Sequence, residues 1–287
     1  MSNGGKKSAG GNALVAPSSL LLLCFSVVPL IMLVYFSFIN GNIASNGSIS
    51  GYTVNNFRLI FADATFTKLM LKSIGIGLIV TLICVVIAYP TAWGIAKVAK
   101  KKNHNLLIML VIVPFFTSQL LLIYSIMVIL QAKGLLMSLL GFLGLADPTT
   151  SILYSNPAVV IVLVYEYLPY MILCIYNSIE KIDDNVIYAS RSLGAGWFKT
   201  FVNVVFPMSM PGLLSGIMPV PGSFVEPGLV GGSNGMMVGS LINSQFSTVL
   251  NMGYGAALSF VFLIIISAIM GIVKSLMSRA NRSIGGA

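Results

Sequence analysis

Long apolar runs, separated by short polar stretches, set the pattern of the whole chain. Six of these runs are long enough for a helix to cross the hydrocarbon core of a bilayer, which is about 30 Å thick. They lie at about residues 13–39, 69–96, 105–130, 157–176, 206–225 and 256–277. The pattern therefore predicts an all-α polytopic membrane protein with six transmembrane helices, the third of which contains Pro114.

The chain opens on a polar tail, residues 1–12, for which its Gly, Ser, Asn and Lys content predicts a flexible segment. A single transmembrane domain is then expected over residues 13–282. A cleavable signal peptide is the alternative interpretation of the first apolar run. Because the apolar part of a signal peptide spans only about 7–15 residues, and the run at 13–39 is longer, we expect a permanent helix.

One polar-studded segment, residues 185–203, separates the fourth and fifth apolar runs. Its large apolar side chains, Leu193, Trp197 and Phe201, recur at helical spacing. Gly194 lies between two helical patterns and predicts a turn. We expect a short helix, a glycine turn and a second short helix, all outside the bilayer. An amphipathic helix that rests on lipid headgroups is the alternative.

The composition excludes a water-soluble fold. Of the 287 residues, 57% are hydrophobic and only 8% are charged, whereas an average soluble domain has about 25% charged residues. A chain of this length cannot hide so much apolar surface from water. The net charge of +9 does not indicate nucleic-acid binding, because the basic residues gather between apolar runs, as orientation signals do.

These basic residues divide unevenly between the two sides of the predicted membrane. One side holds Lys6, Lys7, Lys97, Lys100, Lys101, Lys102, Lys181, Arg191, Lys199, Lys274, Arg279 and Arg282, and the other holds Arg58, Lys68, Lys72 and Lys133. Loops rich in Lys and Arg face the cytoplasm. Both termini, the loop at 97–104 and the loop at 180–205 are therefore predicted to be cytoplasmic.

No catalytic or metal-binding pattern is present in the sequence. The nucleotide-binding pattern Gly-x-x-x-x-Gly-Lys-Ser/Thr and the common zinc and hydrolase motifs are missing. Cys24, Cys84 and Cys174 each lie inside an apolar run, and His104 is the only histidine, so we expect neither a disulfide framework nor a metal site. The chain is predicted not to be an enzyme and to need no cofactor of its own.

The loop segment resembles the signature of bacterial binding-protein-dependent ABC transporter permeases. That signature is Glu-Ala-Ala, three residues, Gly, nine residues and Ile-x-Leu-Pro. Here Tyr188-Ala189-Ser190 precedes Gly194, and Val204-Val205-Phe206-Pro207 follows after nine residues. Tyr188 replaces the family Glu, which affects any charged contact made there but not the shape of the loop.

The resemblance extends over most of residues 80–260 and is closest to the spermidine/putrescine permeases. The motifs that carry it are Tyr89-Pro90-Thr91-Ala92-Trp93, Pro114-Phe115-Phe116-Thr117-Ser118, Leu168-Pro169-Tyr170-Met171 and Pro207-Met208-Ser209-Met210-Pro211-Gly212. Permeases for iron, sulfate, molybdate and opines share the loop signature, so another small solute is the alternative substrate. A self-sufficient secondary carrier is a further alternative, and a scaffold without transport activity is a third.

The resemblance implies the fold and the partners of a type I ABC importer permease in the bacterial inner membrane. The partners would be a cytoplasmic ATPase dimer that binds ATP, a second homologous permease subunit and an extracytoplasmic solute-binding protein. The coupling loop at 185–203 would dock on the ATPase. The residues assigned to docking are Tyr188, Ala189, Ser190, Arg191, Leu193, Gly194, Ala195 and Trp197.

Glu166 is the main candidate for contact with substrate. It lies near the middle of the fourth run, where a carboxylate costs at least about 2.5 kcal/mol. Tyr165, Tyr167 and Tyr170 flank it, and of these only Tyr170, four residues on, is expected on the same helix face. A carboxylate beside aromatic rings suits an ammonium group. A protonated Glu bonded to a neighbouring helix is the alternative.

Tyr124 and Glu226 are weaker candidates for the substrate path. Tyr124 and Gln119 are polar positions on the third run, and Glu226 lies at the end of the fifth run, where an exposed interfacial acid is the simpler expectation. Pro219 and Pro221 fall inside the fifth run and predict a kinked or broken helix. Such a break marks either a substrate site or a natural shortening of the helix.

Overall fold

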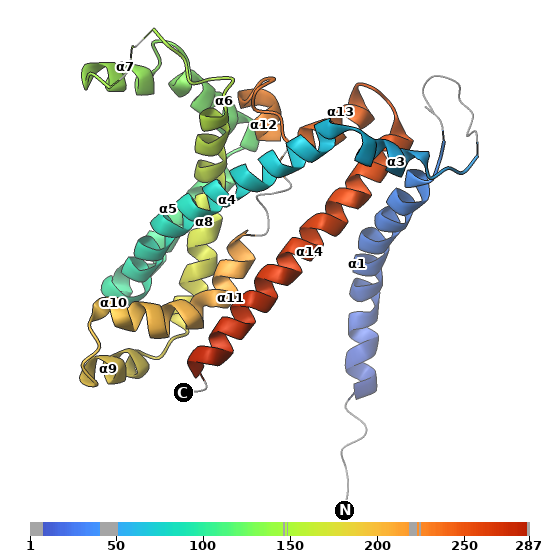
Figure 1. The fold of residues 1–287 in the computed structure, drawn as a ribbon. Coiled ribbons are helices and arrows are strands. Elements are labelled where there is room, and N and C mark those ends of the chain that lie inside the picture. Colours follow the sequence, from blue (N-terminus) through green and yellow to red (C-terminus); the bar gives the residue numbers. More distant parts are fainter. Residues whose placement is uncertain are drawn as a thin grey trace, which may run out of the picture. The chain divides into compact units, whose positions relative to one another are not determined.

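The computed structural model describes residues 8–40, 51–145, 147, 149–217, 223 and 225–285. These residues form helices joined by short turns (Figure 1). Within the described ranges, six helical segments are long and apolar enough to cross a membrane: Pro17–Ser37, Ala64–Val98, Gln119–Phe142, Asn156–Glu180, Trp197–Ile217 and Met252–Ser275. The prediction of an all-α protein with six spans is confirmed. The chain divides into two compact units, Met1–Ala64 with Ile242–Ile265 and Thr65–Leu241 with Ile266–Ala287.

The first unit joins the N-terminal helix to the start of the last one. It contains α1 (Ser8–Ser37), α3 (Asn55–Ala62) and the first part of α14 (Met252–Gly285). The buried Asn56 side chain donates hydrogen bonds to the carbonyl oxygens of Ser37, at 3.0 Å, and Ile39, at 2.9 Å. These bonds satisfy carbonyls that the end of α1 leaves without helical partners.

The second unit holds the candidate site and the docking loop. Its elements are α4 (Ala64–Trp93) with a π-helical turn (Gly94–Val98), α5 (Lys101–Ile112), a 3₁₀ turn (Val113–Phe116), α6 (Gln119–Leu130), α7 (Leu135–Phe142), α8 (Asn156–Glu180), α9 (Asp184–Ser192), α10 (Trp197–Thr200), a π-helical turn (Phe201–Val205), α11 (Phe206–Ile217), α12 (Val225–Val230) and the start of α13 (Val238–Ser247). Within this unit, α9 and α10 lie at one end and α7 and α12 at the other (Figure 1).

Helices α8 and α11 pack closely because glycines line their contact. A Cβ atom at Gly212 would collide with the carbonyl oxygen of Cys174, and one at Gly216 would collide with the sulfur of Met171. Small residues at helix contacts are the usual device for close packing inside a membrane. The core of the unit continues from this contact to α4 through buried side chains such as Val80 and Leu163.

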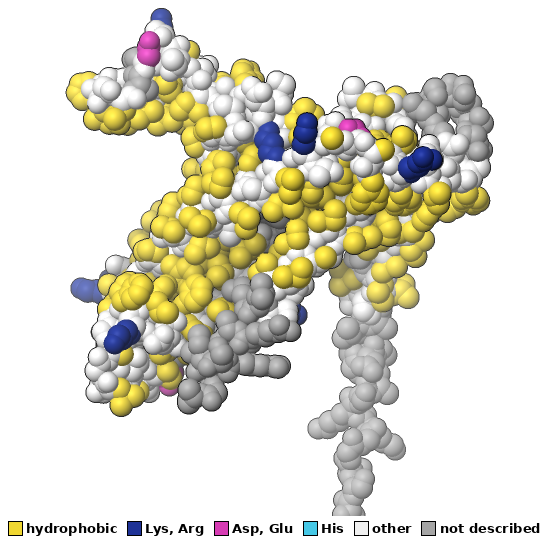
Figure 2. Space-filling model, viewed as in Figure 1, with side chains coloured by type: hydrophobic (Ala, Val, Ile, Leu, Met, Phe, Trp, Pro, Cys, Tyr) yellow, Lys and Arg dark blue, Asp and Glu magenta, His cyan; other side chains and the backbone are white. Residues whose placement is uncertain are grey.

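Large apolar side chains also cover the outside of the helices. On α4, Leu78, Leu82 and Val86 are spaced by four residues, lie on one face and are 66%, 66% and 63% exposed. Figure 2 shows hydrophobic side chains along the helices, with the visible Lys, Arg, Asp and Glu side chains toward the helix ends. An apolar stripe of this kind, left exposed by the rest of its own unit in the described ranges, fits contact with lipid or with another membrane-embedded segment.

Two expectations about helix boundaries are wrong. The run at 105–130 is not one helix: α5 ends at Ile112, and α6 begins at Gln119 after the 3₁₀ turn. Pro114 explains this break, since it has no N–H to donate and disfavours helical geometry at the residue before it. The second helix of the loop is not separate either, because α10 continues through the π-helical turn into α11.

The predicted break in the fifth run lies largely outside the described residues. Pro219 and Pro221 are both in that undescribed part. On its two sides, α11 ends at Ile217 and the separate helix α12 begins at Val225.

Candidate substrate site and docking loop

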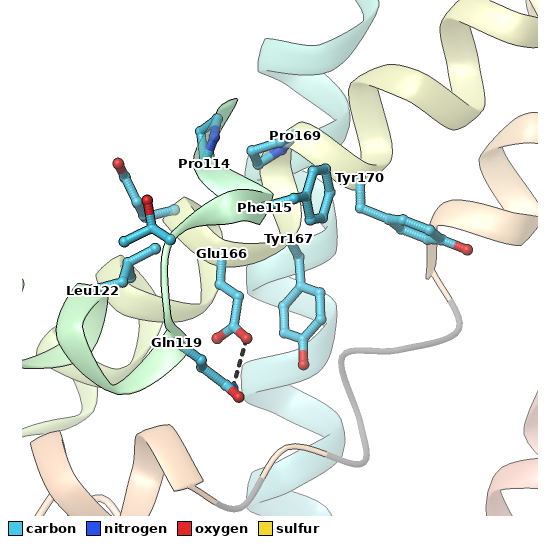
Figure 3. A pocket seen from close by; sticks show the side chains of 10 residues that line it. Pro114, Phe115, Gln119, Leu122, Glu166, Tyr167, Pro169 and Tyr170 are labelled. Atoms are coloured by element: carbon cyan, nitrogen blue, oxygen red, sulfur yellow. Dashed lines mark hydrogen bonds between the residues drawn. The ribbon is translucent and has the colours of Figure 1, made fainter. Parts of the chain in front are cut away.

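The break between α5 and α6 places a non-helical segment beside Glu166 on α8. Val113–Phe116 form the 3₁₀ turn, Thr117 is extended, and Gln119 opens α6 after Ser118. In Figure 3, Glu166 points toward Gln119 and Tyr167 lies beside it, whereas Tyr170 points away from both. Glu166 and Tyr170 nevertheless line the same cavity.

Next to Glu166 is a cavity of about 280 Å³. Its lining combines aromatic rings and prolines with the polar side chains of Thr117, Gln119 and Glu166. The lining residues are Pro114, Phe115, Thr117, Gln119, Leu122, Tyr165, Glu166, Tyr167, Pro169 and Tyr170. The successive residues Tyr165, Glu166 and Tyr167 all line this cavity.

Gln119 joins two carboxylates that are far apart in the sequence. Its side-chain nitrogen donates one hydrogen bond to Glu166 Oε1, at 2.7 Å, and another to Glu226 Oε1, at 2.8 Å. The second oxygen of each carboxylate is buried and has no hydrogen-bond partner among the described residues. A carboxylate accepts hydrogen bonds at both oxygens, so this arrangement leaves acceptor capacity for a further donor.

Glu226 reaches this place because α12 packs onto α6 and α8. Val230 of α12 is buried with Ile123 and Ile126 of α6 and with Val162 of α8. Glu226 is 1% exposed. The expectation of an exposed interfacial acid is therefore wrong: apolar packing of the short helix carries its carboxylate inward.

Of the predicted candidates, the structure brings Glu166 and Glu226 together, with Tyr170 on the cavity wall, and leaves Tyr124 apart. Tyr124 lies on α6, is 53% exposed and does not line the cavity, so its role stays a prediction. Ser223 was not a candidate from the sequence; its hydroxyl oxygen lies 2.8 Å from that of Tyr167. Gln119 was a weaker candidate, as a polar position on the third run, but its link to both acids was not predicted.

The coupling loop at 185–203, below called the docking segment, forms a helix, a tight turn and the start of the fifth span. Asp183 caps α9 by accepting a hydrogen bond from the backbone N–H of Asn185 at 2.9 Å. Gly194 has φ +85°, the left-handed conformation that ends many helices, and so makes the predicted turn. Leu193 is 89% exposed and Phe198 70%. Such exposed apolar side chains outside a helix core indicate a contact surface.

A salt bridge ties this segment to the end of α4. Lys97 Nζ lies 2.7 Å from Asp184 Oδ1 and also donates to the carbonyl oxygen of Ile182 at 2.7 Å. The basic loop after α4 and the docking segment therefore lie at the same end of the unit, as the charge count predicted.

No group of three or more His, Cys, Asp or Glu side chains in the described part of the chain is placed to hold a metal ion.

Known proteins with similar sequences are transport permeases. The profile of the family described as "Binding-protein-dependent transport system inner membrane component" matches residues 78–283. The spermidine/putrescine transport system permease protein PotB of Escherichia coli K12 is 35% identical over 91% of this chain and 94% of that protein. PotB of Haemophilus influenzae is 34% identical over 91% and 90%. The inner membrane ABC transporter permease protein YdcU of Escherichia coli K12 is 29% identical over 78% and 76%.

Solved structures support the fold. A bacterial alginate ABC transporter, in complex with its alginate pentasaccharide-bound periplasmic protein, contains a chain with a TM-score of 0.74, 15% sequence identity and 94% coverage of both chains. A second structure of a bacterial ABC transporter that imports alginate gives a TM-score of 0.69 at 14% identity, covering 93% of this chain and 94% of that one. The family profile and the PotB relatives show that the chain belongs to the family of binding-protein-dependent transport system inner membrane components, as a multi-pass permease subunit of an ABC importer.

Proposed function

We propose that this permease imports polyamines of the spermidine and putrescine type. The observation that carries the proposal is Glu166, a carboxylate on a membrane-spanning helix at a cavity walled by Phe115, Tyr165 and Tyr167. A carboxylate attracts an ammonium group by charge, and aromatic faces add cation–π attraction. The PotB relatives, named as spermidine/putrescine permeases, support the same substrate class.

The size of the cavity agrees with a small, flexible cation. Its volume of about 280 Å³ lies just below the usual range for ligand pockets, about 300–1,000 Å³. Prolines and aromatic rings supply most of the wall, so the methylene chain of an alkylamine would meet apolar surface while its charged end meets Glu166.

The chain works, in this proposal, with partners that supply energy and substrate. A cytoplasmic ATPase dimer binds ATP and docks on α9 and the turn at Gly194, where Tyr188, Leu193 and Trp197 are 61%, 89% and 56% exposed. A second homologous permease completes the pathway, and an extracytoplasmic solute-binding protein delivers substrate. Closure of the ATPase pair then moves the permeases as rigid bodies between inward-open and outward-open states.

The orientation belongs to the same proposal. The docking segment, the loop after α4 and both termini face the cytoplasm of a bacterial cell, as the distribution of Lys and Arg indicates. Membership of an ABC importer family argues against a self-sufficient carrier, which would transport without an ATPase.

Uptake of radiolabelled putrescine and spermidine tests the proposal. The complete importer is placed in cells that lack other polyamine uptake, and unlabelled polyamines, amino acids and metal chelates compete with the label. We expect competition by polyamines alone, and a loss of uptake of about tenfold or more in Glu166→Gln, because the amide removes the charge that holds the ammonium.

The matched control is Asp147→Asn, which removes an acid from an exposed loop. Asp147 accepts hydrogen bonds from the Thr149 backbone and hydroxyl, at 2.9 and 2.7 Å, and these bonds hold the pKa of Asp147 below its ordinary value, so it is ionised at neutral pH. Its amide variant should transport normally. Full uptake in Glu166→Gln, or competition by a metal chelate instead of a polyamine, would contradict the proposed substrate.

A further inference from the structure

We propose that Gln119 is an internal stand-in for substrate: its amide occupies the position between Glu166 and Glu226 that a primary ammonium group takes in the loaded permease. The inference rests on the proposed function, because it assigns the binding position for one end of an alkylamine. It adds a second carboxylate, Glu226, and a residue that must leave before the cation binds.

The first observation is that one nitrogen holds both carboxylates. Gln119 Nε2 lies 2.7 Å from Glu166 Oε1 and 2.8 Å from Glu226 Oε1. An amide nitrogen has two N–H donors, and both are used here. A primary ammonium carries three donors and a full positive charge, so it fits the same point between two acceptors and binds each of them more strongly.

The second observation is that acceptor capacity is left over. Oε2 of Glu166 and Oε2 of Glu226 are buried and lack a partner within the described ranges, and the whole Glu226 residue is 1% exposed. A buried acceptor without a donor is costly, and a neutral amide cannot balance two carboxylates. A primary ammonium has enough donors for both Oε1 atoms and one of the two Oε2 atoms, and its charge offsets one of the two carboxylates. A neutral alcohol brings a donor but no charge, and an anion adds repulsion.

The third observation is that Gln119 is free to move while the acids are held. Gln119 is the first residue of α6, follows the non-helical segment and is exposed. Glu226 is fixed by the buried contacts of α12 with α6 and α8. The Gln119 side chain can therefore turn out of the site at little cost in packing, and the two carboxylates stay in place to receive the ammonium.

Two substitutions of Gln119 test the inference because they are expected to act in opposite directions. Gln119→Leu removes the internal competitor and should tighten binding of radiolabelled putrescine to the purified importer complex, measured without the solute-binding protein, by about tenfold. Gln119→Lys places a tethered ammonium between the acids and should weaken it by about tenfold or more. Glu226→Gln should also weaken binding, and Gln131→Leu, at the exposed far end of α6, should leave it unchanged.

A purely structural role for Gln119 predicts that both of its variants bind less well, so weaker binding by Gln119→Leu in a stable complex overturns the inference. If Gln119→Leu does not assemble, Gln119→Lys decides: binding equal to the unaltered complex rejects the stand-in. Unlabelled putrescine and butylammonium should compete with radiolabelled putrescine for binding. The neutral 1,4-butanediol should not compete.

The failure of this inference is distinct from failure of the proposed function. If the unaltered importer takes up putrescine but the Gln119 variants do not differ in the expected directions, the polyamine function stands and the stand-in is rejected. If it takes up no polyamine but Gln119→Leu binds butylammonium more tightly and Gln119→Lys more weakly, the ammonium position stands and the substrate assignment falls.

Discussion

Replacing Gly194 by residues with a Cβ atom should uncouple the permease from its ATPase through backbone conformation alone. Gly194 has φ +85°, and no heavy atom lies within 4 Å of the position a Cβ would take. Its N–H donates to the carbonyl oxygen of Arg191 at 3.0 Å, and the N–H of Ala195 donates to that of Ser190 at 3.2 Å, so the turn closes the end of α9. A substitution there meets no steric obstacle and changes only the preferred backbone geometry.

The size of the effect follows from the left-handed conformation. An ordinary L-residue loses about 1–2 kcal/mol there, and Asn loses less because its side chain bonds locally. A shift of that size lowers the ratio of formed to unformed turns about 5–30-fold. We therefore expect Gly194→Ala to reduce ATP-driven uptake to about a fifth or less, and Gly194→Asn to retain more activity than Gly194→Ala.

The assay is uptake into proteoliposomes that contain the complete importer, normalised to the amount of permease and ATPase recovered in the membrane. Gly196→Ala is the matched control, because Gly196 is two residues away, has equally open surroundings, and adopts φ −67°, which any residue tolerates. Equal losses in Gly194→Ala and Gly196→Ala would refute the backbone argument. Normal uptake and ATPase docking in Gly194→Ala would refute the docking role of this turn.

Two further predictions concern the salt bridge and the helix contact. Lys97→Met removes the contacts to Asp184 and to the Ile182 carbonyl, which are worth about 1 kcal/mol at a partly exposed position. We expect the variant to hydrolyse more ATP per molecule transported. An unchanged ratio of ATP to transported molecules would show that coupling does not need this contact between the end of α4 and α9. Gly212→Val forces a side chain against the Cys174 carbonyl and should cost about 1–3 kcal/mol of stability, seen as a lower melting temperature of the purified complex. Gly75→Val, whose new side chain enters open space, should leave the melting temperature unchanged. Equal melting temperatures of the two variants would reject the close α8–α11 contact.

The spans were predictable because a membrane-crossing helix needs about 20 consecutive, mostly apolar residues, and such runs are visible in the sequence. Each predicted run overlaps a candidate span of the structure. The interruption at Pro114 was not predictable in the same way, because proline is tolerated in membrane helices when neighbours satisfy the freed groups. Whether a proline bends a helix or ends it depends on those neighbours, which the local sequence does not contain.

The docking loop illustrates a different limit. Its first helix and the turn at Gly194 followed from spacing and from the need for a left-handed residue. The continuation of α10 into α11 did not, because Lys199 and Asn203 give this stretch a polar appearance. Polar residues in the first turns of a span lie near the interface, where they cost little, so polarity alone does not mark a helix end.

The least predictable feature is the meeting of Gln119 with Glu166 and Glu226, and its energetics explain why it matters. Gln119 and Glu226 are separated by 107 positions, and only the apolar packing of α12 brings them together. A carboxylate in the membrane interior costs at least about 2.5 kcal/mol, and a buried polar cluster with missing partners is less stable than an apolar one of the same shape. Folding alone gives no reason to place a second buried acid here. The proposed ammonium substrate would give that reason, because its charge and its donors would stabilise the two carboxylates while it is bound.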